Sequence, residues 1–164
     1  MDGADPANEL RFTIAHELAH FLLDYRRPRA QTIQRFGNDI SSVLDGLREP
    51  TANQRVDAIL SNTPIGFYAH FMHRHDTGDP TPTTLVSETQ ADTFALELLA
   101  PETQVRERLP RGFFKKPFKE RINSLNRLLT RHFDLPKDVA AQHANRLCRL
   151  WFGGPSVREW LGLT

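Results

Sequence analysis

Apolar side chains recur at helical spacing in several stretches of this chain, and the pattern predicts a mainly helical protein. The first stretch, residues 11–23, reads RFTIAHELAHFLL, with apolar residues returning every three to four positions. Residues spaced in this way share one face of an α-helix. We therefore expect an amphipathic, largely buried helix from about Asn8 to Tyr25, followed by a surface turn at residues 26–29.

Further helices are expected wherever the same spacing returns. They cover residues 51–60, 88–100, 102–109, 117–132 and 137–152, and the last two form a C-terminal helical pair over residues 117–152. The resulting fold class is mainly α, or α+β at most, in one domain spanning residues 1–164.

Three segments fall outside the helical pattern. Residues 83–86 are rich in β-branched side chains and could form a short strand. Residues 62–82 contain Gly66, Gly78 and three prolines, a composition typical of a long loop. Residues 1–8 are expected to be disordered or a remnant of a longer N-terminus.

The first predicted helix carries the strongest chemical signal. The run His16-Glu17-Leu18-Ala19-His20 places two histidines four residues apart. On a helix both imidazoles lie on one face and can reach one metal ion, while Glu17 can act on a water molecule. This spacing is typical of zinc peptidases, which combine two nitrogen ligands, a general base and an open coordination position. The alternative is a pair of core histidines held by hydrogen bonds.

A catalytic zinc site has three protein ligands, so the chain must supply one more. Glu88 and Asp92 lie one turn apart at the start of a predicted helix, with Ser87 as the expected N-cap. Glu88 can bind zinc, and Asp92 can accept a hydrogen bond from the outer nitrogen of a ligating histidine. Both acids could instead form an exposed helix start favoured by the helix dipole. Asp24, one turn beyond His20, is a further candidate partner for a ligand.

These stretches resemble the ImmA/IrrE family of metallopeptidases. The resemblance rests on RFTIAHELAH at residues 11–20 and on ETQADTFALELLAP at residues 88–101, and it extends more weakly over residues 128–147. It implies a zincin-like minimal domain with an active-site helix, a glutamate helix and little sheet.

By position, the resemblance implies roles for five residues. His16, His20 and Glu88 would bind one Zn²⁺ per chain. Glu17 would be the catalytic base, and Asp92 would support a histidine ligand. Members of the family cleave helix-turn-helix repressors, so the implied activity is a zinc-dependent endopeptidase acting on a DNA-binding repressor protein.

A rival expectation is a non-catalytic binding module, in which a structural zinc supports recognition of a repressor or an antitoxin. The intact Glu17 counts against it, because a structural zinc site needs no base. In the predicted loop, Tyr68, His70 and His73 could stabilise an oxyanion on the scissile carbonyl. An ordinary polar surface loop is the interpretation we favour there.

Composition narrows the function classes further. The 21 Lys and Arg against 20 Asp and Glu give a net charge of +1, so the chain is not globally basic and no direct nucleic-acid binding is expected. Nine basic residues between positions 106 and 131 nevertheless face only Glu107 and Glu120. They could steer an acidic partner or a DNA-bound repressor, but a solvated helix face is the interpretation we favour.

The single cysteine, Cys148, excludes a disulfide framework within the chain and fits a reducing compartment. Its apolar neighbours favour a place in the core. No apolar run approaches membrane-spanning length, and residues 1–6 do not form a signal peptide. We therefore expect a cytoplasmic protein with no membrane partner.

Overall fold

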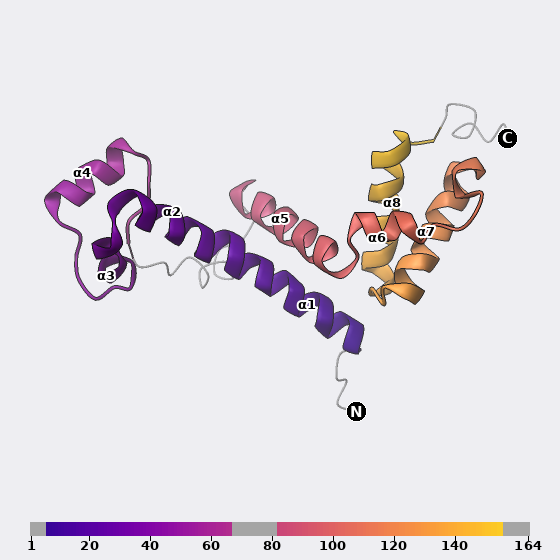
Figure 1. The fold of residues 1–164 in the computed structure, drawn as a ribbon, viewed down its shortest axis with the longest axis horizontal. Coiled ribbons are helices and arrows are strands. Elements are labelled where there is room, and N and C mark those ends of the chain that lie inside the picture. The colour runs from indigo at the N-terminus through magenta and orange to yellow at the C-terminus, as the bar shows by residue number, and fades with distance from the viewer. Residues whose placement is uncertain (1–5, 67–81, 156–164) are drawn as a thin grey trace. The chain divides into compact units, whose positions relative to one another are not determined.

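The structure, a computed structural model, describes residues 6–66 and 82–155, and every regular element in these ranges is helical (Figure 1). The predicted mainly α fold is therefore confirmed, and the zincin-like arrangement stays a prediction. No strand occurs in the described ranges, and segment 83–86, considered as a strand, is helical. None of the described helices is both long and apolar enough to cross a lipid bilayer.

Residues 7–36 form one continuous helical run. In it α1 spans Ala7–His20, the π-helical turn η1 spans Phe21–Arg26 and α2 spans Arg27–Phe36. The elements that follow are η2 (Asn38–Ile40), α3 (Ser41–Leu44), α4 (Ala52–Leu60), α5 (Pro82–Leu99), α6 (Glu102–Glu107), η4 (Phe113–Lys115), α7 (Phe118–His132) and α8 (Lys137–Phe152).

The helices predicted over residues 51–60, 102–109, 117–132 and 137–152 are confirmed, with small differences at their ends. Helices α1 and α5 begin earlier than predicted, inside the segments 1–8 and 62–82. Ala7 and Asn8 already belong to α1, and Pro82 already belongs to α5.

The surface turn predicted at residues 26–29 is wrong, because the chain stays helical through Pro28 to Phe36. Proline lacks a backbone N–H and clashes with the carbonyl group four residues before it, so it normally breaks a helix. Here Pro28 lies in the first turn of α2, directly after the wider π-helical turn η1. The helical hydrogen-bond pattern therefore changes from π to α at the place where the N–H that Pro28 lacks would otherwise be needed.

The chain divides into two compact units. Unit 1 combines Met1–His16 with Thr93–Thr164, and unit 2 is Glu17–Asp92. The division falls inside α1 and inside α5, so each of these helices contributes residues to both units. The prediction of one domain over residues 1–164 stays a prediction.

The core of unit 1 is assembled mainly from α7, α8 and the segment that precedes them. Phe113, Leu125, Leu129 and Leu147 are buried in one apolar cluster. Complete burial of an apolar side chain of this size contributes about 1.5–3 kcal/mol to folding. Cys148 lies in the same cluster, as predicted, and burial raises the pKa of its thiol, which keeps it protonated and unreactive.

Arg11 ties the start of α1 to the turn between α7 and α8. Its Nη2 group donates hydrogen bonds to the backbone oxygens of Phe133 and Asp134, the second at 3.0 Å. Asp134 has a positive φ of 51°, and carbonyl groups just beyond a helix end have no partner within that helix. The fixed donors of a guanidinium group suit two such carbonyls. The first half of α1 is thereby held to the core of unit 1.

Unit 2 has a smaller core, in which Ile40, Val43 and Leu44 are buried together. Its helix α4 begins with a capping box formed by Thr51 and Gln54. The Gln54 N–H donates to Thr51 Oγ1 at 3.3 Å, and the Thr51 N–H donates to Gln54 Oε1 at 3.0 Å. These two bonds satisfy backbone donors that a helix start leaves unpaired.

The two faces of α1 differ in burial. Ala15, Ala19 and His20 are buried, whereas Ile14 is 59% and Leu18 is 41% exposed. The helix is therefore apolar on both faces rather than amphipathic. The prediction of a largely buried helix holds only for the face that carries His20.

His143 on α8 is a buried titratable group. Its exposed fraction is 3%, and neither ring nitrogen has a hydrogen-bonding partner within the described part of the chain. Burial, and then the positive charge of Arg146, lowers the pKa of His143 to about 4, while Glu102 acts in the opposite direction. The imidazole is therefore neutral in the folded protein at pH 7.

We expect the free energy of unfolding to fall as the pH is lowered from 6.5 to about 4, because His143 gains a proton only when the chain unfolds. This contribution is fully present above pH 6.5 and amounts to about 3 kcal/mol, which is lost as the pH approaches the folded value. Denaturant titrations across that range measure it. His143→Leu should lose this pH-dependent component, and His132→Leu, at an exposed position, should keep it. Equal pH dependence in all three proteins would contradict the assignment.

Candidate metal centre

The two histidines of the motif lie at the C-terminal end of α1, one turn apart on the same face. His20 is buried, with an exposed fraction of 2%, and His16 is half-buried. Each follows a buried alanine, Ala15 or Ala19. The helix therefore presents two imidazoles beside its buried positions.

Asp24 orients the second histidine. Its Oδ2 atom lies 2.8 Å from Nδ1 of His20, four residues earlier along the helical run. An imidazole that donates from Nδ1 keeps its lone pair on Nε2, which is the tautomer that a metal ligand needs. Asp24 therefore selects both the direction of the His20 ring and the nitrogen that it can offer to a metal.

The same carboxylate oxygen also holds α5. The Ser87 hydroxyl donates a hydrogen bond to Asp24 Oδ2 at 2.7 Å. The next residue, Glu88, faces the histidine, with its Oε2 atom 3.5 Å from His20 Nε2. The hydrogen bond to Ser87 thus positions the residue that precedes the predicted third ligand.

Ser87 was predicted to be a helix N-cap, and this is wrong because α5 begins at Pro82 and includes it. Serine before an acidic, apolar-periodic stretch is a common N-cap pattern, which explains the misassignment. The signal that could have identified its role is Asp24, since a carboxylate beside a histidine ligand can accept a second hydrogen bond.

The residues fit a zinc ion. His16, His20 and Glu88 each offer one ligand atom, and these three atoms lie within 4.8 Å of one another. Ligand atoms about 2.0–2.2 Å from a tetrahedral zinc are roughly 3.3–3.6 Å apart, which matches the 3.5 Å between His20 Nε2 and Glu88 Oε2. The most distant pair, no more than 4.8 Å apart, would need to close by at most about 1.5 Å. Two imidazoles and one carboxylate form a donor set that zinc accepts.

Glu17 follows His16 on α1, and its side chain is exposed. It is not one of the three clustered ligand residues, and its role as a base stays a prediction. Exposure leaves the carboxylate accessible to water and to a substrate.

Asp92 lies one turn beyond Glu88 on α5 and is exposed. The structure shows Asp24 as a hydrogen-bond acceptor for His20, and the predicted role of Asp92 stays a prediction. Tyr68, His70 and His73, the candidates for stabilising an oxyanion, lie outside the described residues.

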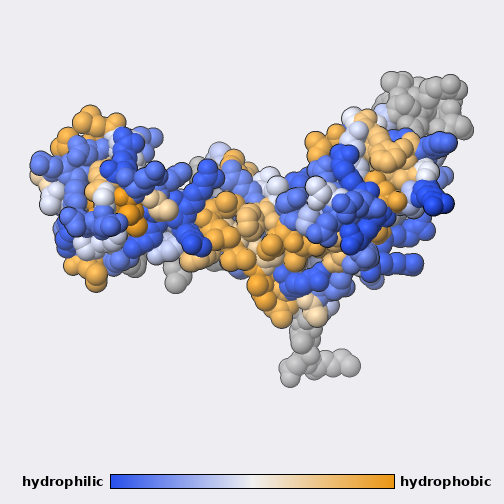
Figure 2. Space-filling view, in the orientation of Figure 1, coloured by the Kyte–Doolittle hydropathy of each residue, from blue (hydrophilic) through white to orange (hydrophobic). Residues whose placement is uncertain are grey.

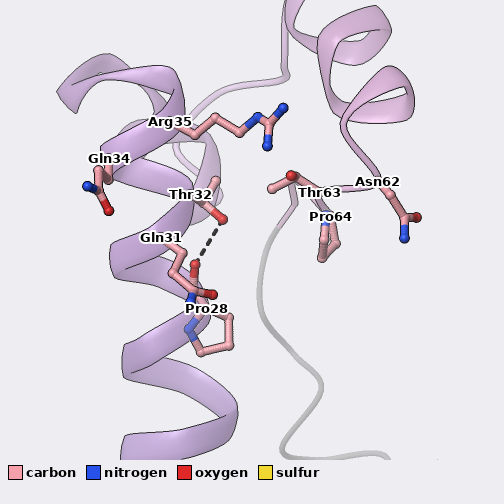
Figure 3. A pocket seen from close by; sticks show the side chains of 8 residues that line it. All are labelled: Pro28, Gln31, Thr32, Gln34, Arg35, Asn62, Thr63 and Pro64. Atoms are coloured by element: carbon pink, nitrogen blue, oxygen red, sulfur yellow. Dashed lines mark hydrogen bonds between the residues drawn. The ribbon is translucent and has the colours of Figure 1, made fainter.

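Unit 2 also contains a polar pocket of about 460 Å³ between α2 and the residues that follow α4 (Figure 3). Arg35 extends from α2 towards Thr63 across this pocket, and Thr32 donates to the backbone oxygen of Pro28 at 2.9 Å (Figure 3). The lining contains no carboxylate, histidine or cysteine. It therefore offers neither a general base nor the side chains that usually bind zinc.

Comparison with known proteins finds no match among family models, curated proteins or solved structures. The case for a metal centre therefore depends on the residues and distances of this chain. The likeness to the ImmA/IrrE family stays a resemblance at the two motifs.

We expect one Zn²⁺ per chain, with zinc–nitrogen distances of about 2.0–2.1 Å in X-ray absorption spectra. Glu88→Gln keeps the side-chain size but removes an anionic ligand. Its zinc affinity, measured by competition with a chelator, should fall by more than the roughly 10–100-fold that loss of a supporting partner costs. Glu97→Gln, at an exposed position of the same helix, is the control. Unchanged affinity in Glu88→Gln would exclude Glu88 as the third ligand.

Asp24→Ala should lower zinc affinity by roughly 10–100-fold, because His20 then loses the partner that fixes its tautomer. The same competition titration measures this, and circular dichroism checks that the helices persist. Asp57→Ala removes an exposed carboxylate from α4 of the same unit and should bind zinc like the parent. Asp92→Ala, measured alongside, tests the predicted role of Asp92. If Asp24→Ala and Asp57→Ala bind zinc equally well, Asp24 does not support the site.

Proposed function

We propose that this protein is a zinc-dependent endopeptidase. The observation that supports the proposal most directly is the convergence of two imidazole nitrogens and one carboxylate oxygen. Three such ligands leave one coordination position for water or substrate, as in catalytic rather than structural zinc sites. The exposed Glu17 beside His16 supplies a base that a structural site would not need.

Each residue has a distinct task in this mechanism. A zinc ion, when bound, acts as a Lewis acid towards the scissile carbonyl group. His16 and His20 would hold the ion as neutral ligands, and Glu88 would hold it as an anion. Glu17 takes a proton from the attacking water and passes it to the leaving amine. Asp24 keeps the Nδ1 proton of His20 in place, so the ring does not turn its other nitrogen to the metal.

The mechanism makes zinc binding dependent on pH. Protons and zinc compete for the imidazole nitrogens, so activity should decline in acid as the metal is released. For the substrate we propose a helix-turn-helix transcriptional repressor, which is the class that the resemblance to the ImmA/IrrE family implies.

Glu17→Gln tests the catalytic role separately from metal binding. The substitution keeps the size of the side chain and a hydrogen-bonding group but removes the ability to accept a proton. We expect zinc affinity close to that of the parent and a loss of peptidase activity of at least ~10²-fold. Cleavage of a helix-turn-helix repressor encoded beside the gene, followed by mass spectrometry, measures the activity.

Glu9→Gln is a matched control, since Glu9 is an exposed glutamate two turns earlier on α1 and should leave cleavage unchanged. Equal cleavage by the parent and Glu17→Gln would refute the role of Glu17 as base. If the parent binds the repressor tightly but never cleaves it with zinc present, the protein is the binding module and not the peptidase.

A further inference from the structure

The basic stretch of unit 1, residues 106–131, falls into two groups in the structure. Four of its nine lysines and arginines contact another side chain of unit 1. Arg106 contacts Glu102 and Trp151, and Arg108 contacts Gln104 and Phe133. Lys116 donates to Ser124, and Arg121 contacts Phe114 and Phe152. The remaining five are exposed and belong to no ion pair seen in the described residues, and one of them, Arg127, donates from Nε to the backbone oxygen of Asn123 at 3.3 Å.

Three of these five lie in a single row on α7. Lys119, Arg127 and Arg131 are exposed, and with Asn123 they are spaced by four residues along the helix. The row extends over 12 helical steps from Lys119 to Arg131, roughly 18 Å at the rise of an α-helix. The opposite face of α7 is buried in the core of unit 1, so the row has a rigid support. Hydrophilic side chains predominate over α7 on the visible face (Figure 2).

The stability of α7 does not account for this row. Lys119 lies in the first turn, where the helix dipole disfavours a cation, and Arg127 and Arg131 are like charges one turn apart. Only Arg131, in the last turn, is favoured by the dipole. Glu120, the sole acid of α7, is adjacent to Lys119 in sequence, and adjacent helical residues do not face each other. The helix is therefore less stable than it would be with mixed charges.

We propose that the row formed by Lys119, Asn123, Arg127 and Arg131 binds the phosphate backbone of duplex DNA without reading its sequence. Arginine, lysine and asparagine all donate hydrogen bonds to phosphate oxygens. A protein partner fits less well, because protein docking surfaces have an apolar centre and few lysines. No large hydrophobic side chain of α7, all of whose residues are described, is exposed. The row is independent of the metal centre, and it would bring the protein to the DNA that a repressor occupies.

The test is a titration of a labelled duplex of about 20 base pairs and arbitrary sequence, followed by fluorescence anisotropy at several salt concentrations. Three phosphate contacts predict a slope of about −3 in log K against log salt concentration. Replacing two of them, Lys119→Gln with Arg131→Gln, should make the slope shallower by about 2 and weaken binding at low salt at least ~tenfold.

The matched control is Lys137→Gln with Arg149→Gln on α8, which also removes one lysine and one arginine from exposed positions of unit 1. It should bind DNA like the parent, and circular dichroism of both variants checks folding. The proposal fails if the parent shows no salt-dependent binding at about 50 mM salt. It also fails if the two double variants weaken equally, or if polyglutamate binds more tightly than the duplex, which would identify an acidic protein as the partner.

Discussion

The arrangement of the candidate metal centre depends on one atom, Oδ2 of Asp24. It accepts hydrogen bonds from Nδ1 of His20 at 2.8 Å and from the hydroxyl of Ser87 at 2.7 Å. One bond orients a histidine at the end of α1, and the other fixes the residue before Glu88 in α5. Hydrogen bonds to an ionised carboxylate are stronger than those between neutral groups, so this acceptor suits the task. A single carboxylate therefore sets the positions of two ligands that lie far apart in the sequence.

Asp24 can accept both hydrogen bonds because the helical run continues beyond His20. The π-helical turn η1 carries Asp24 and then joins α2, so the carboxylate sits on a structured segment rather than on a loop. Such wide turns often accompany functional sites, since they change the direction of side chains without breaking the helix. The same turn precedes Pro28 and lets the helical run continue to the core of unit 2. The π-helical turn thus positions Asp24 beside the candidate metal centre and also keeps the helical run continuous.

The sequence predicts the parts of this structure that depend on local spacing. The histidine pair, the C-terminal helices and Glu88 as a possible ligand all follow from periodicity and residue chemistry. The hydrogen bond between Ser87 and Asp24 does not, because these two residues lie 63 positions apart in the sequence. Residues 83–86 suit a strand by composition, yet they are helical, since strand preference depends on the surroundings of the side chains.

The net charge of the chain does not describe how its charges are distributed. A net charge of +1 argues against a nucleic-acid-binding protein only if the charges are evenly spread. Unit 2, Glu17–Asp92, holds ten acidic and seven basic residues, so the basic excess belongs to unit 1. Interactions between exposed charges fade over about 10 Å at ordinary salt concentrations. A polyanion at α7 therefore responds to the nearby row of cations and not to the charge of the whole chain. The same reasoning holds for a metal cation, which responds to the carboxylates of Glu88 and Asp24 beside it.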